Sequence, residues 1–273
     1  AGGSWKPLIL RFPGAEDMTV DRACISCLSR DCREWIQGFR KCNACGLWFR
    51  DAMPAEADLK GVHEGHYSGR NAGDGTVQLL STEESLDNHA DFIRRIVEPP
   101  ARVLDFGAGT GGLVRRLASA GYPASGCEYS DGARAEAKSR HGLVLYPSLD
   151  ETRGTYDLIA VIEVVEHLLN PRKIMARLHE RLNPNGILYL ATPNTNGLRA
   201  RLQGGRWREA IRPYHVALYN YRALRTLAMN SGFREVRYVR FSPLTSKAIR
   251  HRWLHRALQS FGLYGGLRVL CYK

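Results

Sequence analysis

The sequence predicts an α/β fold in which a largely parallel sheet carries helices on both faces. The clearest sign is VLDFGAGTGG at residues 103–112, where an apolar run typical of a buried parallel strand enters a glycine turn. Residues 113–120 continue with apolar side chains at helical spacing. Further short apolar runs alternate with helical segments, as expected for this class. Two Cys-x-x-Cys pairs near the N-terminus predict a small metal-binding element beside the main domain.

The glycine turn brings a ligand close to the backbone, because a Cβ atom would collide there and the helix N–H groups face the ligand. Gly107, Gly109 and Gly112 fit the pattern G-x-G-x-x-G, so a dinucleotide is one interpretation. Asp105, at the end of the strand, favours a different ligand. A carboxylate repels a pyrophosphate but attracts a cationic sulfonium. The alternative for Asp105 is a side chain that stabilises the turn by accepting from loop N–H groups.

The pattern apolar-apolar-Asp-apolar-Gly-x-Gly at residues 103–109 resembles the first motif of class I S-adenosylmethionine (SAM) dependent methyltransferases. The resemblance implies SAM as the cofactor and a Rossmann-like sheet of seven strands, the last antiparallel between the fifth and sixth. It covers residues 81–273. It implies methyl transfer to oxygen, carbon or nitrogen of a small molecule such as a sugar, a nucleotide-linked compound or a natural-product intermediate. In this turn it assigns cofactor contacts to Asp105, Gly107, Ala108 and Gly109.

A chain of 273 residues accommodates one large α/β domain and a small accessory element. No apolar stretch approaches the ~20 residues of a membrane span, and no signal-peptide core is present, so we expect a soluble, cytoplasmic protein. The net charge is +12, and residues 195–273 hold 14 Arg and 2 Lys against Glu209 and Glu235. This favours an anionic partner: a phosphorylated or nucleotide-linked substrate, RNA, or an anionic membrane surface. A solvated, arginine-rich surface is the alternative.

Two Cys-x-x-Cys pairs separated by 14 residues lie within the predicted N-terminal element, residues 1–60. Each pair holds one side of a tetrahedral ion. The pattern predicts a structural zinc site with four ligands, Cys24, Cys27, Cys42 and Cys45. Cys32 lies between the pairs and is expected to be a bystander. Because a four-thiolate site has no open position, we assign it no catalysis. The alternative to a zinc site is four reduced, partly buried cysteines.

In the same N-terminal element, an edge strand is predicted within residues 7–12.

Residues 61–80 are polar and glycine-rich, which predicts a linker after one helical turn at residues 55–60. A zinc element followed by such a linker resembles a methyltransferase subgroup, some of whose members modify sugars or natural products. In that subgroup a linker aromatic residue folds over the cofactor, and the resemblance assigns this role to Tyr67. A surface aromatic residue is the alternative. A helix is predicted over residues 81–97, with Ser81 as its N-cap.

A short strand is predicted to end at Glu128, which lies 19 residues after Gly109. This is close to the ~20 residues expected for an acid that accepts the ribose hydroxyls. Tyr129 follows and is expected to stack on the adenine. A helix at residues 131–141 and a third strand at residues 143–146 come next. The resemblance implies that the following loop, Ser148 and Leu149, brackets the adenine, although Pro-Ser-Leu here replaces the Gly-Asp of many relatives.

A fourth strand is predicted at residues 156–161, and the sequence IEVVEHLLNP continues it. This stretch resembles the post-strand motif of the family, which implies Glu163 beside the cofactor and His167 near the transferred methyl group. Glu166 as a helix acid and His167 as a structural histidine are the alternatives. A dinucleotide dehydrogenase has no need of this acidic motif. A helix over residues 171–182 and a fifth strand follow, and Asn194 at the end of that strand is expected to orient the acceptor.

Residues 196–220 match the place where the family covers the acceptor pocket. His215 is the first candidate for a general base, because a neutral imidazole suits removal of a hydroxyl proton near pH 7. A packed histidine is the alternative. The remaining substrate candidates are Tyr214 and Arg199, with Arg201, Arg206, Arg208 and Arg212 as a further clamp for an anionic group. Helices at residues 221–230 and 248–261 and strands at residues 233–241 and 266–272 complete the chain.

Two other functions are compatible with these patterns. An RNA methyltransferase would use the basic C-terminal third and the zinc element to hold the nucleic-acid backbone. A non-catalytic, zinc-containing nucleotide-binding or scaffold protein would keep the fold without turnover. An NAD-dependent enzyme is a more distant third. The sequence does not indicate the acceptor atom or the oligomeric state.

Overall fold

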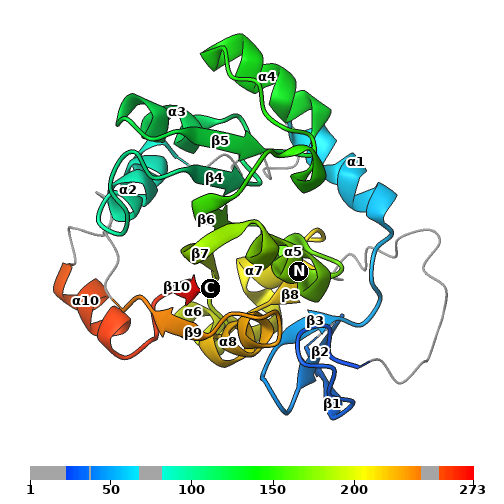
Figure 1. Cartoon of the computed structure of the whole chain (residues 1–273). Coiled ribbons are helices and arrows are strands. Elements are labelled where there is room, and N and C mark those ends of the chain that lie inside the picture. Colours follow the sequence, from blue (N-terminus) through cyan, green and yellow to red (C-terminus); the bar gives the residue numbers. More distant parts are fainter. Residues whose placement is uncertain (1–22, 37, 68–81, 241–251) are drawn as a thin grey trace.

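The computed structural model describes residues 23–36, 38–67, 82–240 and 252–273; the edge strand predicted within residues 7–12 lies outside them. A six-stranded sheet forms the centre of the larger part, in the order β5-β4-β6-β7-β10-β9 (Figure 1). Its strands are β4 (Val103–Phe106), β5 (Ala124–Cys127), β6 (Tyr156–Ile162), β7 (Leu182–Pro193), β9 (Glu235–Tyr238) and β10 (Gly266–Tyr272). The first four pair in parallel, whereas β10 runs antiparallel to β7 and β9. This confirms the predicted place of the last strand.

The third predicted strand, at residues 143–146, is reduced to a single bridge. Tyr146 pairs in parallel with Cys127, and residues 143–145 are not part of a strand. Pro147 follows directly and lacks the N–H group that would extend the ladder. The prediction of a seven-stranded sheet is therefore corrected to six strands with a one-residue extension at the β5 edge.

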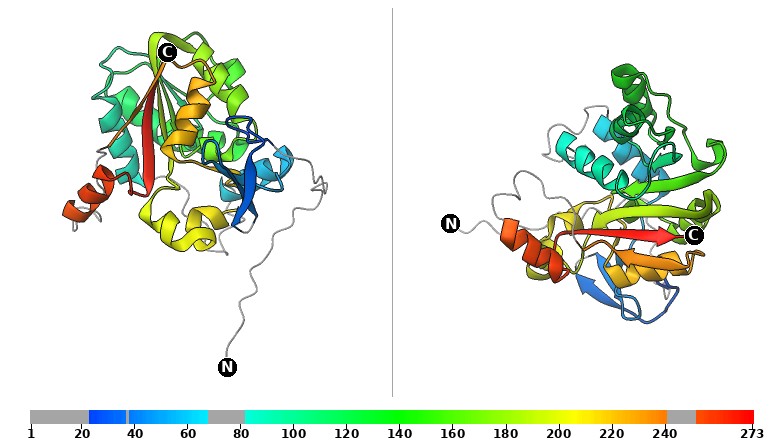
Figure 2. Two further views of the ribbon diagram at one scale, coloured as in Figure 1. Left: turned by 90° about the horizontal axis from the view of Figure 1, so that it is seen from below. Right: turned by 60° about the vertical axis from the view of Figure 1, so that its left-hand side comes forward.

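Side chains alternate between the two faces of the sheet, as the period of a strand requires. In β6, Leu158 and Ala160 pack with the cluster on one face, and Ile159 and Val161 with the cluster on the other. The helices of the first face are α2 (Glu83–Ile93) and α3 (Gly112–Ser119), and those of the second are α5 (Pro171–Glu180) and α8 (Tyr221–Met229). Figure 2 shows the sheet with helices on both sides. The expected three-layered α/β fold is confirmed.

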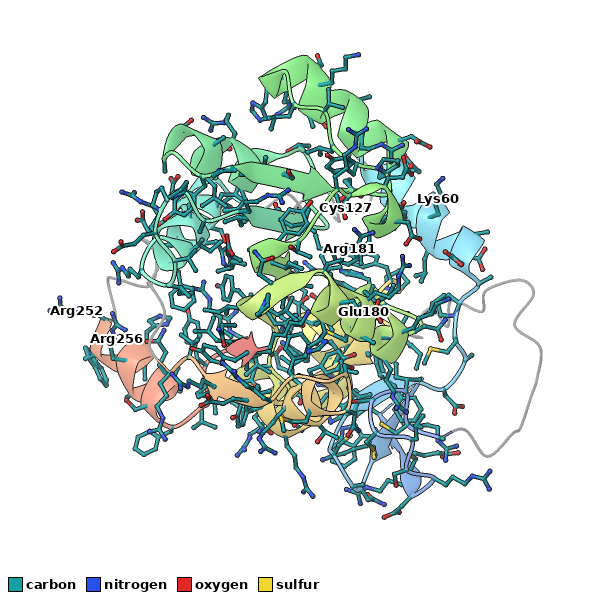
Figure 3. The ribbon with its side chains drawn as sticks, viewed as in Figure 1. Lys60, Cys127, Glu180, Arg181, Arg252 and Arg256 are labelled. Carbon is teal, nitrogen blue, oxygen red and sulfur yellow. The ribbon has the colours of Figure 1, made fainter. Side chains whose placement is uncertain are left out.

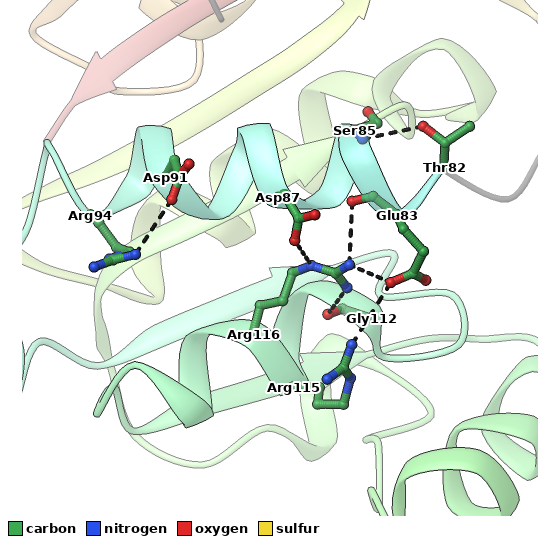
Figure 4. A network of polar contacts seen from close by, with 9 residues as sticks. All are labelled: Thr82, Glu83, Ser85, Asp87, Asp91, Arg94, Gly112, Arg115 and Arg116. Carbon is green, nitrogen blue, oxygen red and sulfur yellow. Dashed lines mark hydrogen bonds and ion pairs between the residues drawn. The ribbon is translucent and has the colours of Figure 1, made fainter. Parts of the chain in front are cut away.

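Helix α2 is fastened to α3 by one arginine. Arg116 donates to Asp87 at 2.5 Å, to the Gly112 carbonyl at 3.0 Å and to the Glu83 carboxylate (Figure 4). The N-cap of α2 is Thr82, whose hydroxyl accepts from the Ser85 N–H, so the prediction that Ser81 caps this helix is wrong by one residue. The hydrogen bond to the Gly112 carbonyl stabilises the end of the glycine turn, because Gly112 is the first residue of α3.

The N-terminal element shares a sheet with the insertion near the end of the chain. The strands β1 (Cys32–Ile36), β2 (Phe39–Cys42) and β3 (Trp48–Arg50) form an antiparallel meander. The fourth strand, β8 (Ala217–Leu218), comes from the insertion and pairs with β3. The insertion also contains α6 (Leu198–Gln203) and α7 (Arg208–Ile211), joined by a 3-10 turn. The element predicted as residues 1–60 thus packs into the same core as the larger sheet.

Helix α1 (Glu56–Tyr67) is longer than the single turn predicted at residues 55–60 and occupies part of the predicted linker. It lies beside α4 (Asp131–His141), as Figure 3 shows for Lys60. The Lys60 ammonium is 3.6 Å from the Asp131 carboxylate. Glu64 accepts from the Asp131 N–H at 2.7 Å and the Gly132 N–H at 3.1 Å, so its negative charge meets the N-terminus of α4. The remaining described helix is α10 (Arg252–Ser260). Among the described helices, none combines the length and apolar character needed to cross a bilayer.

Candidate active site

The glycine turn and the segment after β6 are in direct contact. Gly107 has φ +83°, and a Cβ atom there would lie 2.3 Å from Cγ2 of Val164. Only glycine meets both the conformation and the space at this position. The turn that follows β4 is therefore packed against the residues that follow β6, where the acidic motif begins.

Two acids meet at this turn. Glu128 accepts from the Gly109 N–H and from the Ser130 N–H, both at 2.9 Å. Each carboxylate oxygen keeps a lone pair for a further donor, as two ribose hydroxyls would require. Burial and then the Glu128 charge raise the pKa of Asp105 to about 7. Burial also raises the pKa of Glu128. This pair of buried acids suits a ligand that brings a positive charge.

The residues predicted to hold the adenine are placed less completely. Tyr129 is exposed at the surface after β5. The Ser148 hydroxyl donates to Glu151 at 3.2 Å, and the buried Leu149 begins the 3-10 helix η1 (Leu149–Glu151). Tyr67 is the last residue of α1, and its side chain lies outside the described residues. The structure thus leaves Tyr129 exposed and buries Leu149.

Glu163 has an unusual backbone at the end of β6. Its φ is +55°, a region that non-glycine residues rarely occupy and that is often found at functional sites. Solvent reaches the side chain, yet the surrounding protein desolvates the carboxylate and, together with Glu209, raises the pKa of Glu163 to about 7. Glu163 is therefore an exposed acid at the strand edge whose charge is opposed by that of Glu209.

Three residues after it, Glu166 is fully buried in the 3-10 helix η2 (Val165–His167). The Thr192 hydroxyl at the end of β7 donates to Oε2 of Glu166 at 2.9 Å. The other oxygen, Oε1, has no hydrogen-bond partner among the described residues. Burial and then the Glu163 charge raise the pKa of Glu166 well above its ordinary value, which favours the neutral acid.

Two histidines adjoin Glu166. Nδ1 of His167 lies 3.0 Å from the Tyr214 carbonyl, and Nδ1 of His215 lies 2.9 Å from the Glu209 carbonyl. A carbonyl only accepts, so both Nδ1 atoms carry the proton and Nε2 carries the lone pair in each neutral ring. The ring centroids are 4.9 Å apart. Burial and then His167 hold the pKa of His215 well below its ordinary value. The structure thus brings His167 next to Tyr214 and His215, which come from a distant segment.

Glu166, His167 and His215 each offer one ligand atom, and these atoms lie within 4.8 Å of one another. The cluster sits where β6 and β7 end, next to the glycine turn, because Val164 contacts Gly107 and Thr192 binds Glu166. Ligands of α/β sheets bind at this edge. The place of the cluster therefore suits chemistry on a bound acceptor.

Arg50 contacts the loop of His215, which the sequence did not indicate. From β3 it donates to the carbonyls of Ala210, Arg212 and His215 at 3.1, 2.7 and 3.1 Å. Burial lowers the pKa of its guanidinium to about 10. It holds the loop that carries His215. No local motif marks this arginine, since its partners are at least 160 residues away.

Four thiols of the N-terminal element converge. Sγ of Cys24 is 3.6 Å from that of Cys45, and Sγ of Cys27 is 3.5 Å from that of Cys42. All four lie within 4.8 Å of one another, and none forms a disulfide. Sulfur ligands at about 2.3 Å from a tetrahedral zinc ion lie about 3.8 Å apart, so the four thiols fit zinc. Cys32 lies outside this group, as predicted.

Two predicted substrate contacts are not assembled at the cluster. Asn194 is buried, and its amide donates to the carbonyls of Gly262 and Tyr264 at 3.1 and 3.0 Å. Its oxygen accepts from a backbone N–H, so this side chain holds the loop before β10 instead of facing an acceptor. Arg199 is exposed on α6. Of the further clamp, Arg212 pairs with Glu209 at 2.8 Å, so it balances an acid of the site.

Comparison with known proteins agrees with this geometry. A methyltransferase-domain family matches residues 82–238. The ubiquinone biosynthesis O-methyltransferase of Shewanella halifaxensis is 30% identical over 105 residues, 35% of this chain and 44% of that protein. Its namesake from Azorhizobium caulinodans is 32% identical over 130 residues, 43% of this chain and 51% of that protein. The chain thus spans about half the length of these relatives.

Solved structures share the fold at low sequence identity. Magnesium protoporphyrin IX methyltransferase from Synechocystis PCC 6803, solved with bound S-adenosylhomocysteine, has a TM-score of 0.55 and 15% identity, covering 80% of this chain and 100% of that one. A SAM-dependent methyltransferase from Mesorhizobium loti has a TM-score of 0.53 and 16% identity, covering 69% and 100%. SAM-dependent methyltransferases of known structure thus share its fold, and with the family match spanning more than half of its length, the chain belongs to the methyltransferase-domain family.

Proposed function

We propose that this enzyme transfers the methyl group of SAM to a hydroxyl oxygen of a small, polar or anionic acceptor. The observation that carries the proposal is the pair of imidazoles, His167 and His215, whose Nδ1 atoms lie 3.0 and 2.9 Å from backbone carbonyls. With the proton on Nδ1, Nε2 of His215 would accept the hydroxyl proton as a general base. Relatives named as O-methyltransferases support oxygen as the acceptor atom.

The cofactor would be held by the glycine turn and the two acids that flank it. Asp105 would attract the positive end of SAM, and Glu128 would accept from the ribose hydroxyls while it keeps its bonds to Gly109 and Ser130. Tyr129, Ser148 and Leu149 would border the adenine, and Tyr67 would cover it from α1. When bound, SAM supplies an electrophilic methyl group on a sulfonium.

The protein's part in the transfer is to align two reactants, exclude water and receive one proton. The acceptor oxygen forms its bond to the methyl carbon as the carbon–sulfur bond breaks, which leaves a methyl ether and S-adenosylhomocysteine. The hydroxyl proton passes to Nε2 of His215. Because burial lowers the pKa of His215, the imidazolium is short-lived and returns the proton to solvent.

The four thiols would bind one structural zinc ion. Its work would be to hold β1, β2 and β3 as a rigid support, since an element this small has little core of its own. From that support Arg50 fixes the loop of His215, and the Asn220 amide donates to the Gly46 carbonyl at 3.0 Å. The zinc element thereby belongs to the acceptor side of the enzyme.

An RNA acceptor is a second candidate, favoured by the exposed arginines of the C-terminal third. Arg252 and Arg256 project from α10 (Figure 3), and Arg199 and Arg206 are exposed on the insertion. A backbone-binding face would make affinity fall steeply with salt. Retention of RNA on filters at two salt concentrations distinguishes this candidate from a small-molecule enzyme.

The proposal is tested by calorimetry with S-adenosylhomocysteine and by transfer of labelled methyl groups to hydroxylated small molecules. The His215→Gln variant is expected to bind S-adenosylhomocysteine normally and to lose about 10²- to 10⁴-fold in kcat. His179→Gln, a half-buried histidine on α5, is the matched control and keeps activity. Absence of binding heat with S-adenosylhomocysteine would instead support a non-catalytic protein. Full activity of His215→Gln would show that His215 is not the general base.

A further inference from the structure

We propose that a basic cavity between the zinc element and helix α8 binds the phosphate group of a small phosphate ester, apart from the methyl-transfer site. The cavity has a volume of about 360 Å³. Three cationic side chains line it, Arg33, Lys41 and Arg222, and its described lining contains no carboxylate. No residue of the glycine turn or of the histidine cluster borders it. The inference therefore stands independently of the proposed function.

Strands β1 and β2 place two of these positive charges directly opposite each other. Arg33 pairs with Lys41 across the antiparallel ladder, so both side chains lie on one face of the hairpin. Like charges at opposed positions are destabilising. The neighbouring pair, Glu34 and Arg40, lies on the other face and combines opposite charges. In the described part of the hairpin, the face at the cavity therefore carries only positive charge.

One aromatic ring holds both side chains in place. The Lys41 ammonium is 4.1 Å from the centre of the Trp35 ring, and the central guanidinium carbon of Arg33 is 4.9 Å from it. Such contacts stabilise a cation without neutralising its charge. Within residues 23–36, 38–67, 82–240 and 252–273, no ion pair involves Arg33 or Lys41. The two charges are thus positioned and still open to an anion.

Arg222 brings the third positive charge from a distant segment. It lies in the first turn of α8, which begins beside the zinc element (Figure 1). Asn220 fixes this junction, because its amide donates to the Gly46 carbonyl at 3.0 Å and its oxygen accepts from the Ala223 N–H at 2.8 Å. Gly46 has φ +81°, and a Cβ atom there would lie 2.5 Å from Nδ2 of Asn220. This close approach places Arg222 at the same cavity as the two cations of the hairpin.

Three cations from three elements favour a phosphate monoester over other anions. Near pH 7 such a group carries about −1.5 to −2 charges and three acceptor oxygens, whereas a carboxylate has one charge and two oxygens. Arginine also matches phosphate oxygens through paired N–H groups. A nucleic-acid phosphodiester has one charge per phosphate, so a small ester fits the three cations better.

Two asparagines at the cavity differ in what they have left to give. The Asn43 amide is bonded to Asp31 at 2.7 Å, and Asp31 is not part of the lining. The Asn196 side chain is exposed, and no hydrogen bond engages its amide among the described residues. It therefore adds an uncharged donor for a phosphate oxygen.

The test is calorimetric titration of the full chain, with zinc bound at the four thiols, using phenyl phosphate and benzoate. The two probes share a ring and differ in the anionic group. We expect one phenyl phosphate per chain with a Kd of about 1 mM or lower, and at least about tenfold weaker binding of benzoate. Equal binding of benzoate, or no binding of phenyl phosphate, would overturn the proposal.

Arg222→Gln should weaken binding of phenyl phosphate at least about fivefold, because it removes one charge-assisted contact from the cavity. Arg225→Gln is the matched control, since Arg225 is also exposed on α8 and does not line the cavity. It should bind as the wild type does, and denaturant unfolding checks that both variants fold. Equal weakening in the two variants would show only a general attraction to surface charge and would overturn the site.

A short single-stranded RNA, added as a competitor, distinguishes the sources of phosphate. RNA that leaves phenyl phosphate bound would support a small ester as the ligand. Displacement by RNA in the wild type, with RNA affinity reduced in Arg222→Gln, would overturn that choice and make the cavity a nucleic-acid contact. S-adenosylhomocysteine should bind Arg222→Gln as it binds the wild type, because the cavity holds no residue of the glycine turn.

Discussion

Arg50 donates to the backbone carbonyl of His215 at 3.1 Å, across 165 residues of sequence. The same guanidinium reaches the carbonyls of Ala210 and Arg212. The last strand of the zinc element thus holds the loop that presents a proposed acceptor-side histidine. A substitution in the N-terminal element should therefore change kcat.

We predict that Arg50→Ala lowers kcat and leaves the affinity for S-adenosylhomocysteine unchanged. The three carbonyls lose their donor, so the loop of His215 becomes less fixed, and the free energy of unfolding should fall by about 2–4 kcal/mol. Methyl-transfer kinetics, calorimetry and denaturant unfolding measure the three quantities.

Arg181→Ala is the matched control for this prediction. Arg181 also donates to three backbone carbonyls, those of Asp150, Thr152 and Gly154, but it lies before the start of β7, whereas the histidine cluster lies at the other end of that strand. It should lose stability without a comparable loss of kcat. An equal loss of kcat in both variants would show that stability alone limits turnover.

Removal of the metal from the thiol site should destabilise the protein about as much as the Arg50 substitution does. Cys42→Ser removes one of four ligands, and a loss of about 3 kcal/mol would lower Tm by roughly 6–12 °C in a chain of this size. Elemental analysis should find one zinc fewer per chain. Cys32→Ser is the control, and a zinc content that does not differ between the two variants would contradict the four-thiol assignment.

Glu128→Gln should weaken S-adenosylhomocysteine binding about 10- to 100-fold, because one carboxylate oxygen becomes an N–H donor that faces backbone donors and ribose hydroxyls. Calorimetry checks this. Glu151→Gln, an exposed acid bonded to Ser148, is the control and should bind normally. Unchanged affinity in Glu128→Gln would place the ribose elsewhere.

A buried histidine away from the site predicts a dependence of stability on pH. Burial lowers the pKa of His89 to about 3, and its Nδ1 is 2.8 Å from the Tyr189 hydroxyl. The unfolded chain binds a proton near pH 6.5 and the folded chain does not. His89 therefore supports folding fully above pH 6.5, and this contribution declines as pH falls toward 3.

At pH 5 the loss attributable to His89 should be about 2 kcal/mol. His89→Gln lacks this proton, so the gap in unfolding free energy between wild type and variant should shrink by that amount between pH 8 and pH 5. Denaturant unfolding at the two values measures it. A constant gap would mean that His89 is protonated in the folded protein.

Local patterns were sufficient for most of the fold. Helix α4 and strands β4 and β10 have the bounds that periodicity and turn residues predict, since these signals lie within the elements themselves. The strand predicted at residues 143–146 does not form beyond one bridge, because it lies at the edge of the sheet and Pro147 lacks the N–H group that would extend the pairing. Helix α1 extends further than predicted because Glu64 and Lys60 contact α4, a tertiary effect that a glycine-rich sequence does not reveal.

The candidate site was predictable where one motif supplies several groups. The glycine turn, Glu128, His167 and the four cysteines belong to such motifs. Arg50 and Thr192 could not be found in this way, because each acts through a partner supplied by a distant segment. Asn194 was misjudged for the same reason: its position at a strand end is right, but the loop before β10 uses its amide.

The pairing of β3 with β8 also affects how the protein can be made. On the ribosome, residues 48–50 emerge long before residues 217–218, so one edge of the small sheet stays open during most of translation. A fragment that stops before residue 217 would leave the edge of β3 unpaired and open to association with another chain. A fragment that starts at residue 82 would leave Ala217 and Leu218 without their partner strand. We therefore expect the N-terminal element and the insertion that carries β8 to be soluble only when both are produced in one chain.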